Sequence, residues 1–149
     1  MSKDERINLK LLGKNQEDLK IISAYLQDSI LIIRDMVFLK QNRTFIMVVN
    51  RFMWEDVEKG LFRQNKRIRC ALKFEEVINV KSKNINQKNK NKPLECLAAK
   101  CSSIFDETYK IKIFFAGGSI TTIISEVIEV TLHDLGKSWN VKHIPIHKI

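Results

Sequence analysis

The chain has 149 residues and a formal net charge of +9, and 44% of its residues are hydrophobic. This composition is typical of a globular domain with a buried core, so we expect residues 1–149 to form a single domain. No apolar run approaches the ~20 residues that cross a bilayer, and the first residues lack the apolar core of a signal peptide. These features argue against membrane association, and we expect a soluble cytoplasmic protein.

The N-terminal part predicts one strand followed by one helix. Ile7, Leu9 and Leu11 alternate with polar residues, which is typical of a short strand. Asn15 is a candidate N-cap for an amphipathic helix over residues 16–27, with two acidic residues in the first turn. The apolar stripe of this helix, which we expect to pack on a sheet, consists of Leu19, Ile21, Ile22, Tyr25 and Leu26.

The rest of the chain predicts antiparallel strands separated by short turns. In residues 67–74 apolar and basic side chains alternate, which predicts one buried face. Residues 52–66 show no such alternation and are interpreted as a loop with at most one helical turn. A turn at residues 134–136 ends the last strand, and Trp139 lies in a surface tail. The expected strands are residues 30–40, 44–51, 67–74, 77–80, 94–104, 109–115, 119–125 and 127–132.

Residues 109–125 carry the clearest hairpin pattern, because two period-2 runs flank Gly117 and Gly118. Glycine readily adopts the positive φ that both positions of a two-residue type I′ loop require. The run after the glycines is β-branched, which favours a turn over a phosphate-binding loop before a helix. This loop predicts a core face on which Phe115 pairs with Ile120, Ile113 with Thr122 and Ile111 with Ile124.

Residues 81–93 are rich in Lys and Asn and contain almost no apolar side chains. Such a segment cannot bury enough surface to offset the entropy of ordering it, so we expect a mobile loop. The loop joins residues 30–83 to residues 94–134, and similar pentapeptides, Glu76–Val80 and Glu126–Val130, follow the hairpin of each part. We interpret the two parts as a weak internal repeat.

These elements predict an α+β fold of mostly antiparallel strands, with two similar meanders in one sheet system and one N-terminal amphipathic helix packed on it. Closure into a small barrel, or a pleckstrin-homology-like arrangement, is left open. Cys70, Cys96 and Cys101 lie in strand-like runs and form no CxxC pair. We therefore expect buried free thiols, as in a reducing compartment.

One polar set stands out between the helix and the hairpin that follows it. An ion pair between Asp28 and Arg51 would tie the helix to the sheet without any further function. A pocket beside the indole of Trp54 would instead bind a small ligand or a protein partner. The candidate residues of this set are Gln27, Asp28, Asn50, Arg51, Trp54 and Glu55.

A second set is basic: it could face an anion, but a solvated loop without a binding role is the better interpretation. It lacks the aromatic stacking residues of single-strand binders and any recognition helix. The codons of Lys, Asn and Ile are A/T-rich, so an A/T-rich genome would raise the Lys content without selection for binding. The candidate residues of this set are Arg67, Arg69, Lys73, Lys83, Lys88 and Lys90.

Catalysis and metal binding lack a recognisable motif, because no nucleophile–base pair or carboxylate pair has the necessary spacing. His143 and His147 are four residues apart, but Pro145 excludes the regular helix on which that spacing would hold zinc. His133, beside Asp134, is interpreted as a surface residue rather than a general base. We therefore expect no metal and no cofactor.

Several short strings, in the same order over nearly the whole chain, resemble one family. They are EDL at 17–19 with LQD at 26–28, NRF at 50–52 with WE at 54–55, FAGG at 115–118, and DLG at 134–136 with Trp139. The family is alphaproteobacterial and is catalogued only as domain of unknown function 2948. The resemblance implies a small bacterial cytoplasmic protein and no assigned activity, and the Lys/Asn loop is peculiar to this member.

Together these observations favour a non-catalytic module that binds a protein or a small ligand through the region of Asp28, Arg51 and Trp54. The alternative is a weak binder of nucleic acid or another anionic polymer through the Lys-rich loop. A second alternative is an enzyme of unknown class.

Overall fold

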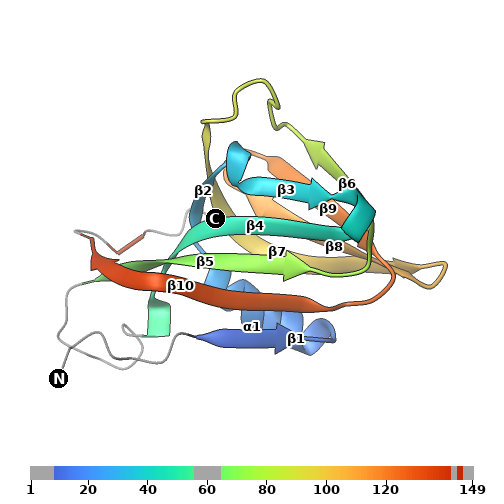
Figure 1. Ribbon diagram of the computed structural model, residues 1–149, viewed down its shortest axis with the longest axis horizontal. Coiled ribbons are helices and arrows are strands. Elements are labelled where there is room, and N and C mark those ends of the chain that lie inside the picture. Colours follow the sequence, from blue (N-terminus) through green and yellow to red (C-terminus); the bar gives the residue numbers. More distant parts are fainter. Residues whose placement is uncertain (1–8, 56–64, 142–143, 146–149) are drawn as a thin grey trace.

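The computed structural model describes residues 9–55, 65–141 and 144–145, and only the backbone of Phe105. These residues form one ten-stranded antiparallel sheet and a helix that packs against it (Figure 1). The predicted α+β fold with a mostly antiparallel sheet is therefore confirmed. The elements are β1 (Lys10–Gly13), α1 (Gln16–Leu26), β2 (Ile30–Ile32), the 3-10 helix η1 (Ile33–Asp35), β3 (Met36–Leu39), the 3-10 helix η2 (Lys40–Asn42), β4 (Thr44–Phe52), β5 (Lys66–Phe74), β6 (Val77–Lys83), β7 (Pro93–Phe105), β8 (Thr108–Phe115), β9 (Ser119–Ser125) and β10 (Val130–Asn140).

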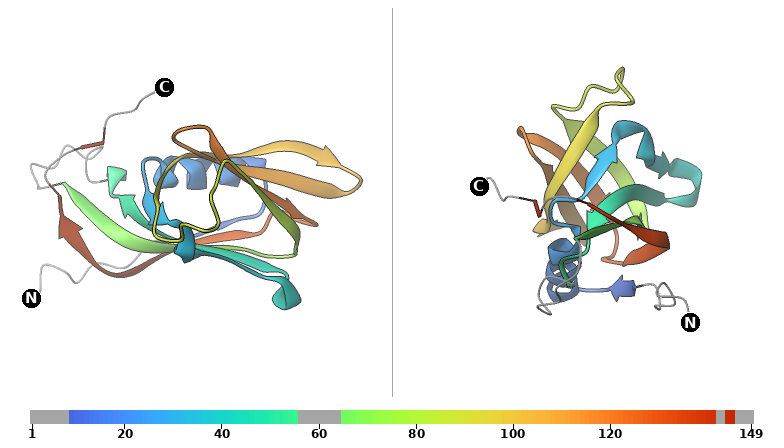
Figure 2. Two further views of the ribbon diagram at one scale, coloured as in Figure 1. Left: turned by 90° about the horizontal axis from the view of Figure 1, so that it is seen from above. Right: turned by 90° about the vertical axis from the view of Figure 1, so that its left-hand side faces the viewer.

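The sheet folds over on itself into two layers (Figure 2). The first layer has the order β1-β10-β5-β4, with β3 beside β4, and the second has the order β7-β8-β9-β6. β2 joins them, because Ile30 pairs with Asn50 of β4 and with Glu95 of β7. The closed small barrel is wrong: among the described strands no pairing joins β6 to β3 or to β1, so the sheet stays open.

The chain crosses between the layers twice in the same way. β4 pairs with β5 in the first layer, and the next strand, β6, pairs with β9 in the second. β8 pairs with β9 in the second layer, and the next strand, β10, pairs with β5 in the first. An internal repeat of residues 30–83 and 94–134 would produce this exchange, but the repeat, like the single domain, stays a prediction.

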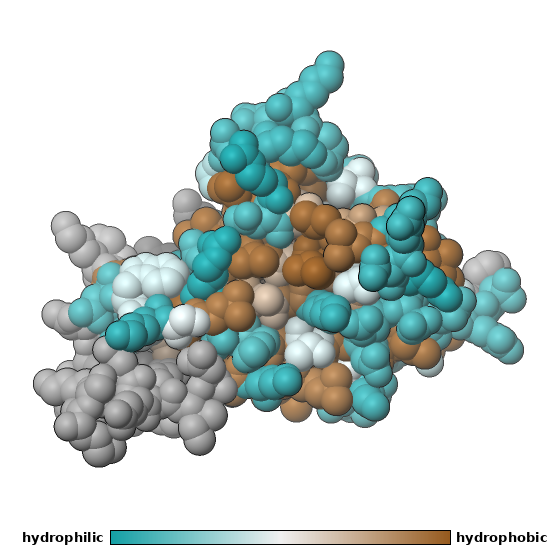
Figure 3. Space-filling view, in the orientation of Figure 1, coloured by the Kyte–Doolittle hydropathy of each residue, from teal (hydrophilic) through white to brown (hydrophobic). Residues whose placement is uncertain are grey.

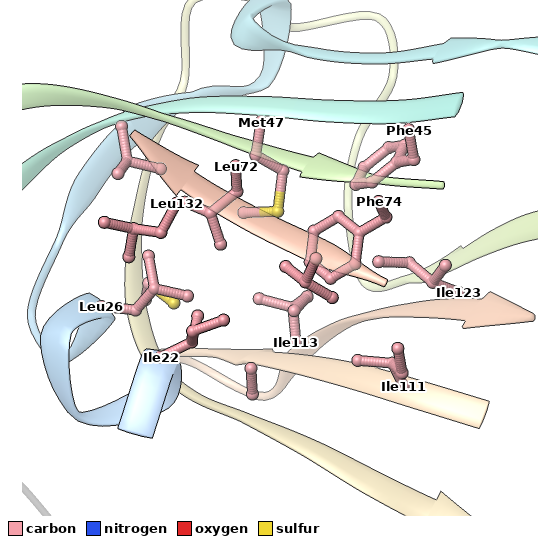
Figure 4. Packing of buried hydrophobic residues seen from close by; sticks show 14 of the residues in the cluster. Ile22, Leu26, Phe45, Met47, Leu72, Phe74, Ile111, Ile113, Ile123 and Leu132 are labelled. Carbon is pink, nitrogen blue, oxygen red and sulfur yellow. The ribbon is translucent and has the colours of Figure 1, made fainter. Parts of the chain in front are cut away.

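Helix α1 fills one opening between the layers and contacts β7 most extensively. The side chain of Asn15 accepts a hydrogen bond from the N–H of Asp18 at 2.8 Å, so the predicted N-cap is confirmed. Ile21 is 54% exposed, contrary to its predicted place in the apolar stripe, because it lies about 200° around the helix from Leu19. The buried helix residues are Leu19, Ile22 and Leu26, and Figure 4 shows Ile22 and Leu26 pointing into the core.

The core between the layers comes from the alternating strands. On β5 the apolar side chains are buried, and Arg69 and Lys73 of the same strand are exposed, so the predicted buried face of residues 67–74 is confirmed. Arg67 departs from this pattern and is half-buried. The two layers meet through Phe45, Met47, Leu72, Phe74, Ile111, Ile113, Ile123 and Leu132 (Figure 4).

The β8–β9 hairpin is confirmed, but its predicted register is wrong by one residue. Phe115 pairs with Ser119, so the loop has three residues instead of two. Ala116 cannot join the β8–β9 ladder because its N–H donates to the carbonyl of Glu95 on β7 at 2.9 Å. A one-residue shift turns every side chain of a strand over. Ser119, Thr121, Ile123 and Ser125 are therefore buried, whereas Ile120, Thr122 and Ile124 are half-buried.

Other boundaries also moved. The predicted strand at residues 30–40 is broken by η1, and the Lys-rich segment 81–93 contributes its ends to β6 and β7. Residues 134–136 do not end the last strand: Gly136, with φ of 68°, lies in an irregularity after which Trp139 pairs with Arg67. Ile7, most of the loop predicted at 52–66, and the histidines at 143 and 147 lie outside the described residues.

Candidate functional site

Arg51 lies near the end of β4 with its side chain fully buried between two carboxylates. Its Nε and Nη2 each donate to Asp134 at 2.7 Å, and its Nη1 and Nη2 donate to Glu55 at 2.9 and 2.7 Å. The guanidinium carbon lies 5.5 Å from the centre of the Tyr25 ring. Burial would lower the pKa of Arg51, but the hydrogen bonds to Asp134 and Glu55 outweigh it and raise the pKa. We call Arg51, Glu55 and Asp134 the arginine cluster.

The ion pair expected between Asp28 and Arg51 is wrong. The guanidinium of Arg51 is already occupied by Glu55 and Asp134. Asp28 instead lies close enough to Arg67 to raise the pKa of that guanidinium, although burial is the larger effect and lowers the pKa overall. Arg67 thus donates to the carbonyl of Asp28 just after the helix, whereas Arg51 contacts the helix through the ring of Tyr25.

Asp134 was missed as a site residue because it was interpreted as part of a turn. In the structure it continues β10 and faces the interior, opposite Cys70 of β5, which is itself opposite Val49 of β4. Val130 and Leu132 precede it on the same face of the strand. The available signal was this period-2 alternation, in which Asp134 is the next inward position.

The remaining residues of the first polar set surround the link between α1 and β2. The indole N–H of Trp54 donates to the carbonyl of Gln27 at 2.8 Å. Nη1 of Arg67 donates to the carbonyls of Asp28 and Asn50, both at 3.0 Å. The structure therefore brings these residues together, and adds to them Arg67 from the basic set.

Aromatic rings complete this region. The rings of Phe52 and Trp54 are 4.6 Å apart, and the guanidinium of Arg67 lies 5.7 Å from the centre of the Phe52 ring. Within the described residues, these polar groups and rings contact one another. This geometry favours a tie between helix and sheet, and the binding role expected for the set stays a hypothesis.

The basic set is divided between two places. On β5, Nη2 of Arg69 lies 3.6 Å from the carboxylate of Asp35, and Nζ of Lys73 lies 3.2 Å from that of Glu75. These two cations are therefore neutralised locally. Within the described residues, the exposed lysines of β6 and of the loop after it form no salt bridge; they are Lys81, Lys83, Lys88, Lys90 and Lys92.

The two buried thiols are not reactive groups. Burial raises the pKa of Cys70 and of Cys96 to about 12, and the carboxylates of Asp134 and Asp28 respectively add to it. A thiol with such a pKa is neutral near pH 7 and is a poor nucleophile. The predicted burial is confirmed for Cys70 and Cys96, whereas Cys101 is only half-buried.

A groove lies between β3 and β6. These two strands are on the side of the molecule away from α1 (Figure 1). The groove exists because η1 displaces the chain after β2, so that β3 pairs with β4 alone. Its volume is about 340 Å³. Figure 3 shows apolar residues gathered there, below the hydrophilic Lys-rich loop. The apolar side chains that line this β3–β6 groove are Ile33, Met36, Phe38, Phe45, Val80 and Ile85.

Backbone hydrogen bonds connect the two sides of the β3–β6 groove at two points. At the first point the N–H of Val77 donates to the carbonyl of Arg43 at 2.7 Å. At the second point the N–H of Arg34 donates to the carbonyl of Lys90 at 2.9 Å, which holds the Lys-rich loop against η1. The groove therefore lies between these two hydrogen-bonded connections and exposes part of the core.

A second hollow, of about 430 Å³, lies beside the loop at Gly117. Its wall includes the polar side chains of Asn84, Lys92 and Glu95, and the strands beneath it, β2 and β7, are paired with each other. Ile30, Pro93 and Leu94 give this hollow an apolar part as well. Among the described strands it nevertheless lacks a free edge like that of β3, and this edge makes the β3–β6 groove the stronger candidate site.

The family model described as Protein of unknown function (DUF2948) matches residues 9–147. The chain belongs to this family. The match spans the arginine cluster and the β3–β6 groove, and it confirms the resemblance over nearly the whole chain. No curated protein and no solved structure matches the chain. Membership of the DUF2948 family brings no assigned activity, so a function has to be argued from the geometry.

Two further findings concern the described part of the chain. No helix in it is long and apolar enough to cross a membrane. No group of three His, Cys, Asp or Glu side chains in it is arranged to hold a metal ion. His133 faces solvent from β10, as predicted.

Proposed function

We propose that the protein is a non-catalytic binding module that holds an apolar part of its ligand in the β3–β6 groove. The supporting observation is an opening in the core: α1 fills one gap between the layers, and no described residue fills the other. Met36, Phe38 and Val80 are only half-buried there although they pack against the core. Apolar pockets with a volume of roughly 300 Å³ or more, including those at the mouths of β-barrels, commonly hold ligands.

The arginine cluster supports this function indirectly. It fixes β4 to β10, and β4 carries Phe45, the residue at the back of the groove. A buried ion pair with every donor satisfied resists rearrangement, because moving either partner leaves an unpaired charge in the core. We propose that the polar set around Asp28, Arg51 and Trp54 positions the groove rather than binding the ligand.

Substitution of one groove residue tests the proposal. Phe38→Ser should weaken binding of the apolar anion anilinonaphthalene sulfonate by about tenfold or more, because a phenyl contact is lost. Fluorescence titration measures the affinity. The matched control is Leu39→Ser, on the same strand but pointing away from the groove and 41% exposed. Equal affinities of the two variants would place the binding elsewhere.

One observation favours a second candidate function, the binding of an anionic polymer. Between residues 77 and 94 the chain carries five lysines and no acidic residue, and none of the exposed lysines forms a described salt bridge. Removing residues 83–92 is a poor test, because Ile85 packs against the core and the carbonyl of Lys90 anchors η1. Substitutions that keep the backbone are preferable.

Lys88→Gln with Lys90→Gln should lower the salt dependence of oligothymidine binding. If both lysines contact phosphates, the slope of log affinity against log salt should fall by about 1.4, since each phosphate contact on a single strand contributes roughly 0.7. Fluorescence anisotropy measures the slope. The control pair, Lys14→Gln with Lys20→Gln, removes the same charge beside and on α1. Equal slopes for both pairs would show that the loop is not the binding surface.

A further inference from the structure

We propose that the β3–β6 groove receives an extended peptide segment of a partner protein, which adds to the free edge of β3 and directs acidic residues toward the Lys-rich loop. This inference rests on the proposed function, because it names the occupant of the same groove. Three features carry it: the edge strand itself, the two faces of that strand, and the distribution of charge along the groove.

The edge of β3 is short, with four residues, but it carries none of the side chains that usually block pairing. β3 pairs with β4 on one side, and no described strand pairs with its other side. Edge strands of natural sheets usually carry lysine, proline or a bulge that prevents pairing with another chain. The four residues of β3, Met36–Leu39, are all apolar and pair with β4 without a bulge. An extended peptide can pair with such an edge through its backbone.

Both faces of β3 are apolar, which distinguishes a peptide from an acyl chain. Met36 and Phe38 line the groove. Val37 and Leu39 point to the opposite face and are 45% and 41% exposed. A strand added to the edge would place alternate side chains in the groove and beside Val37 and Leu39. A lipid lying in the groove would leave the outer pair uncovered.

The charge along the groove is uneven, and this favours an acidic partner. At the end formed by η1 and the Lys-rich loop, Arg34 and the loop lysines have no salt bridge within the described residues. At the other end, Arg43 is already paired with Glu76 at 3.5 Å and with Glu126 at 2.7 Å. An added strand with Asp or Glu beyond its apolar residues would therefore be attracted to the η1 end.

Selection from a phage-displayed library of random peptides tests the occupant. Enriched peptides should combine alternating apolar residues with flanking Asp or Glu. Their synthetic versions should bind the full chain at least about tenfold more weakly after Phe38→Ser, which removes an apolar contact. Lys88→Glu with Lys90→Glu should also weaken them, whereas the same reversal at Lys14 and Lys20 should not. Fluorescence anisotropy measures each affinity. The proposal would be overturned if selection on the wild-type chain enriched no peptide more strongly than selection on the Phe38→Ser variant.

The backbone of the peptide decides between strand addition and other occupants. Successive N–H groups of an extended peptide point to opposite sides, so an enriched peptide is N-methylated at alternate positions in each of the two phases. The phase whose N–H groups face β3 keeps its side chains but loses its donors, so its binding should be abolished. Binding of the unmethylated peptide should slow amide hydrogen exchange in β3. Strand addition would be overturned if every methylated peptide bound as tightly as the unmethylated one. Strand addition would also be overturned if decanoate or a second copy of the chain, and not the peptide, occupied the groove when they compete for it. If strand addition fails but anilinonaphthalene sulfonate still binds the groove, the proposed function stands without this occupant. If anilinonaphthalene sulfonate does not bind the groove either, the proposed function and the strand addition both fail.

Discussion

Replacing Asp134 with alanine should lower the free energy of unfolding by about 3–5 kcal/mol. Asp134 accepts two hydrogen bonds of 2.7 Å from Arg51, and neither side chain has exposed surface. Removing the carboxylate leaves the guanidinium inside the protein, and Glu55 is then its remaining carboxylate partner among the residues that the structure describes. Because a domain of this size is stable by about 5–15 kcal/mol in total, the variant should lose a large share of its stability. Urea denaturation followed by circular dichroism measures the loss.

An exposed ion pair of the same length supplies the control. Nη2 of Arg43 lies 2.7 Å from Glu126, and both side chains are about half exposed. Glu126→Ala should change stability little, since water solvates the remaining charge. If the two variants lost equal stability, burial would not be the reason for the effect at Asp134.

A double substitution separates the pair from its parts. Arg51→Met with Asp134→Leu removes both buried charges, and buried ion pairs replaced by packed apolar residues often cost little. This variant should therefore be more stable than Asp134→Ala alone. A larger loss in the double variant would mean that the core requires the guanidinium itself, for its shape or for its two hydrogen bonds to the mostly buried Glu55.

The sequence predicted those elements whose pattern is local. Alternation located the hairpins, and Asn15 followed by acidic residues located the start of α1. These signals depend on neighbours in the chain, which a sequence displays directly. The order of the strands depends on contacts between distant residues, and a small barrel and an open sheet have the same local pattern.

The errors arose where a distant strand decided the geometry. The hairpin register depends on the hydrogen bond from Ala116 to Glu95, which lies 21 residues earlier in the numbering. The role of Asp134 depends on the guanidinium of Arg51 two strands away. A buried aspartate resembles a turn residue in sequence, because its partner is not visible. The β3–β6 groove likewise depends on where η1 directs the chain, so no motif could have indicated it.

Phe74→Ala should be the second strongly destabilising substitution, with a loss of about 3–5 kcal/mol. Phe74 ends β5, is 1% exposed, and lies opposite Phe45 on one side and Val130 on the other. Its ring centre is 6.0 Å from that of Phe45, between the two layers (Figure 4). Removing the ring should leave a cavity that the paired strands on both sides cannot close. Thermal and urea denaturation measure the effect.

The neighbouring position gives the matched control, because Lys73 lies on the same strand with its side chain outward. Lys73→Ala should stay within about 0.5 kcal/mol of the wild type. Phe45→Ala combined with Phe74→Ala should lose less than the sum of the single losses, since the two rings contact each other and one cavity replaces two. Phe45 also lines the β3–β6 groove, so the cavity left by Phe74 should loosen that wall and weaken binding there. The Phe74→Ala variant could have a lower free energy of unfolding and yet bind anilinonaphthalene sulfonate as the wild type does. That result would show that β3 and β6 alone hold the groove.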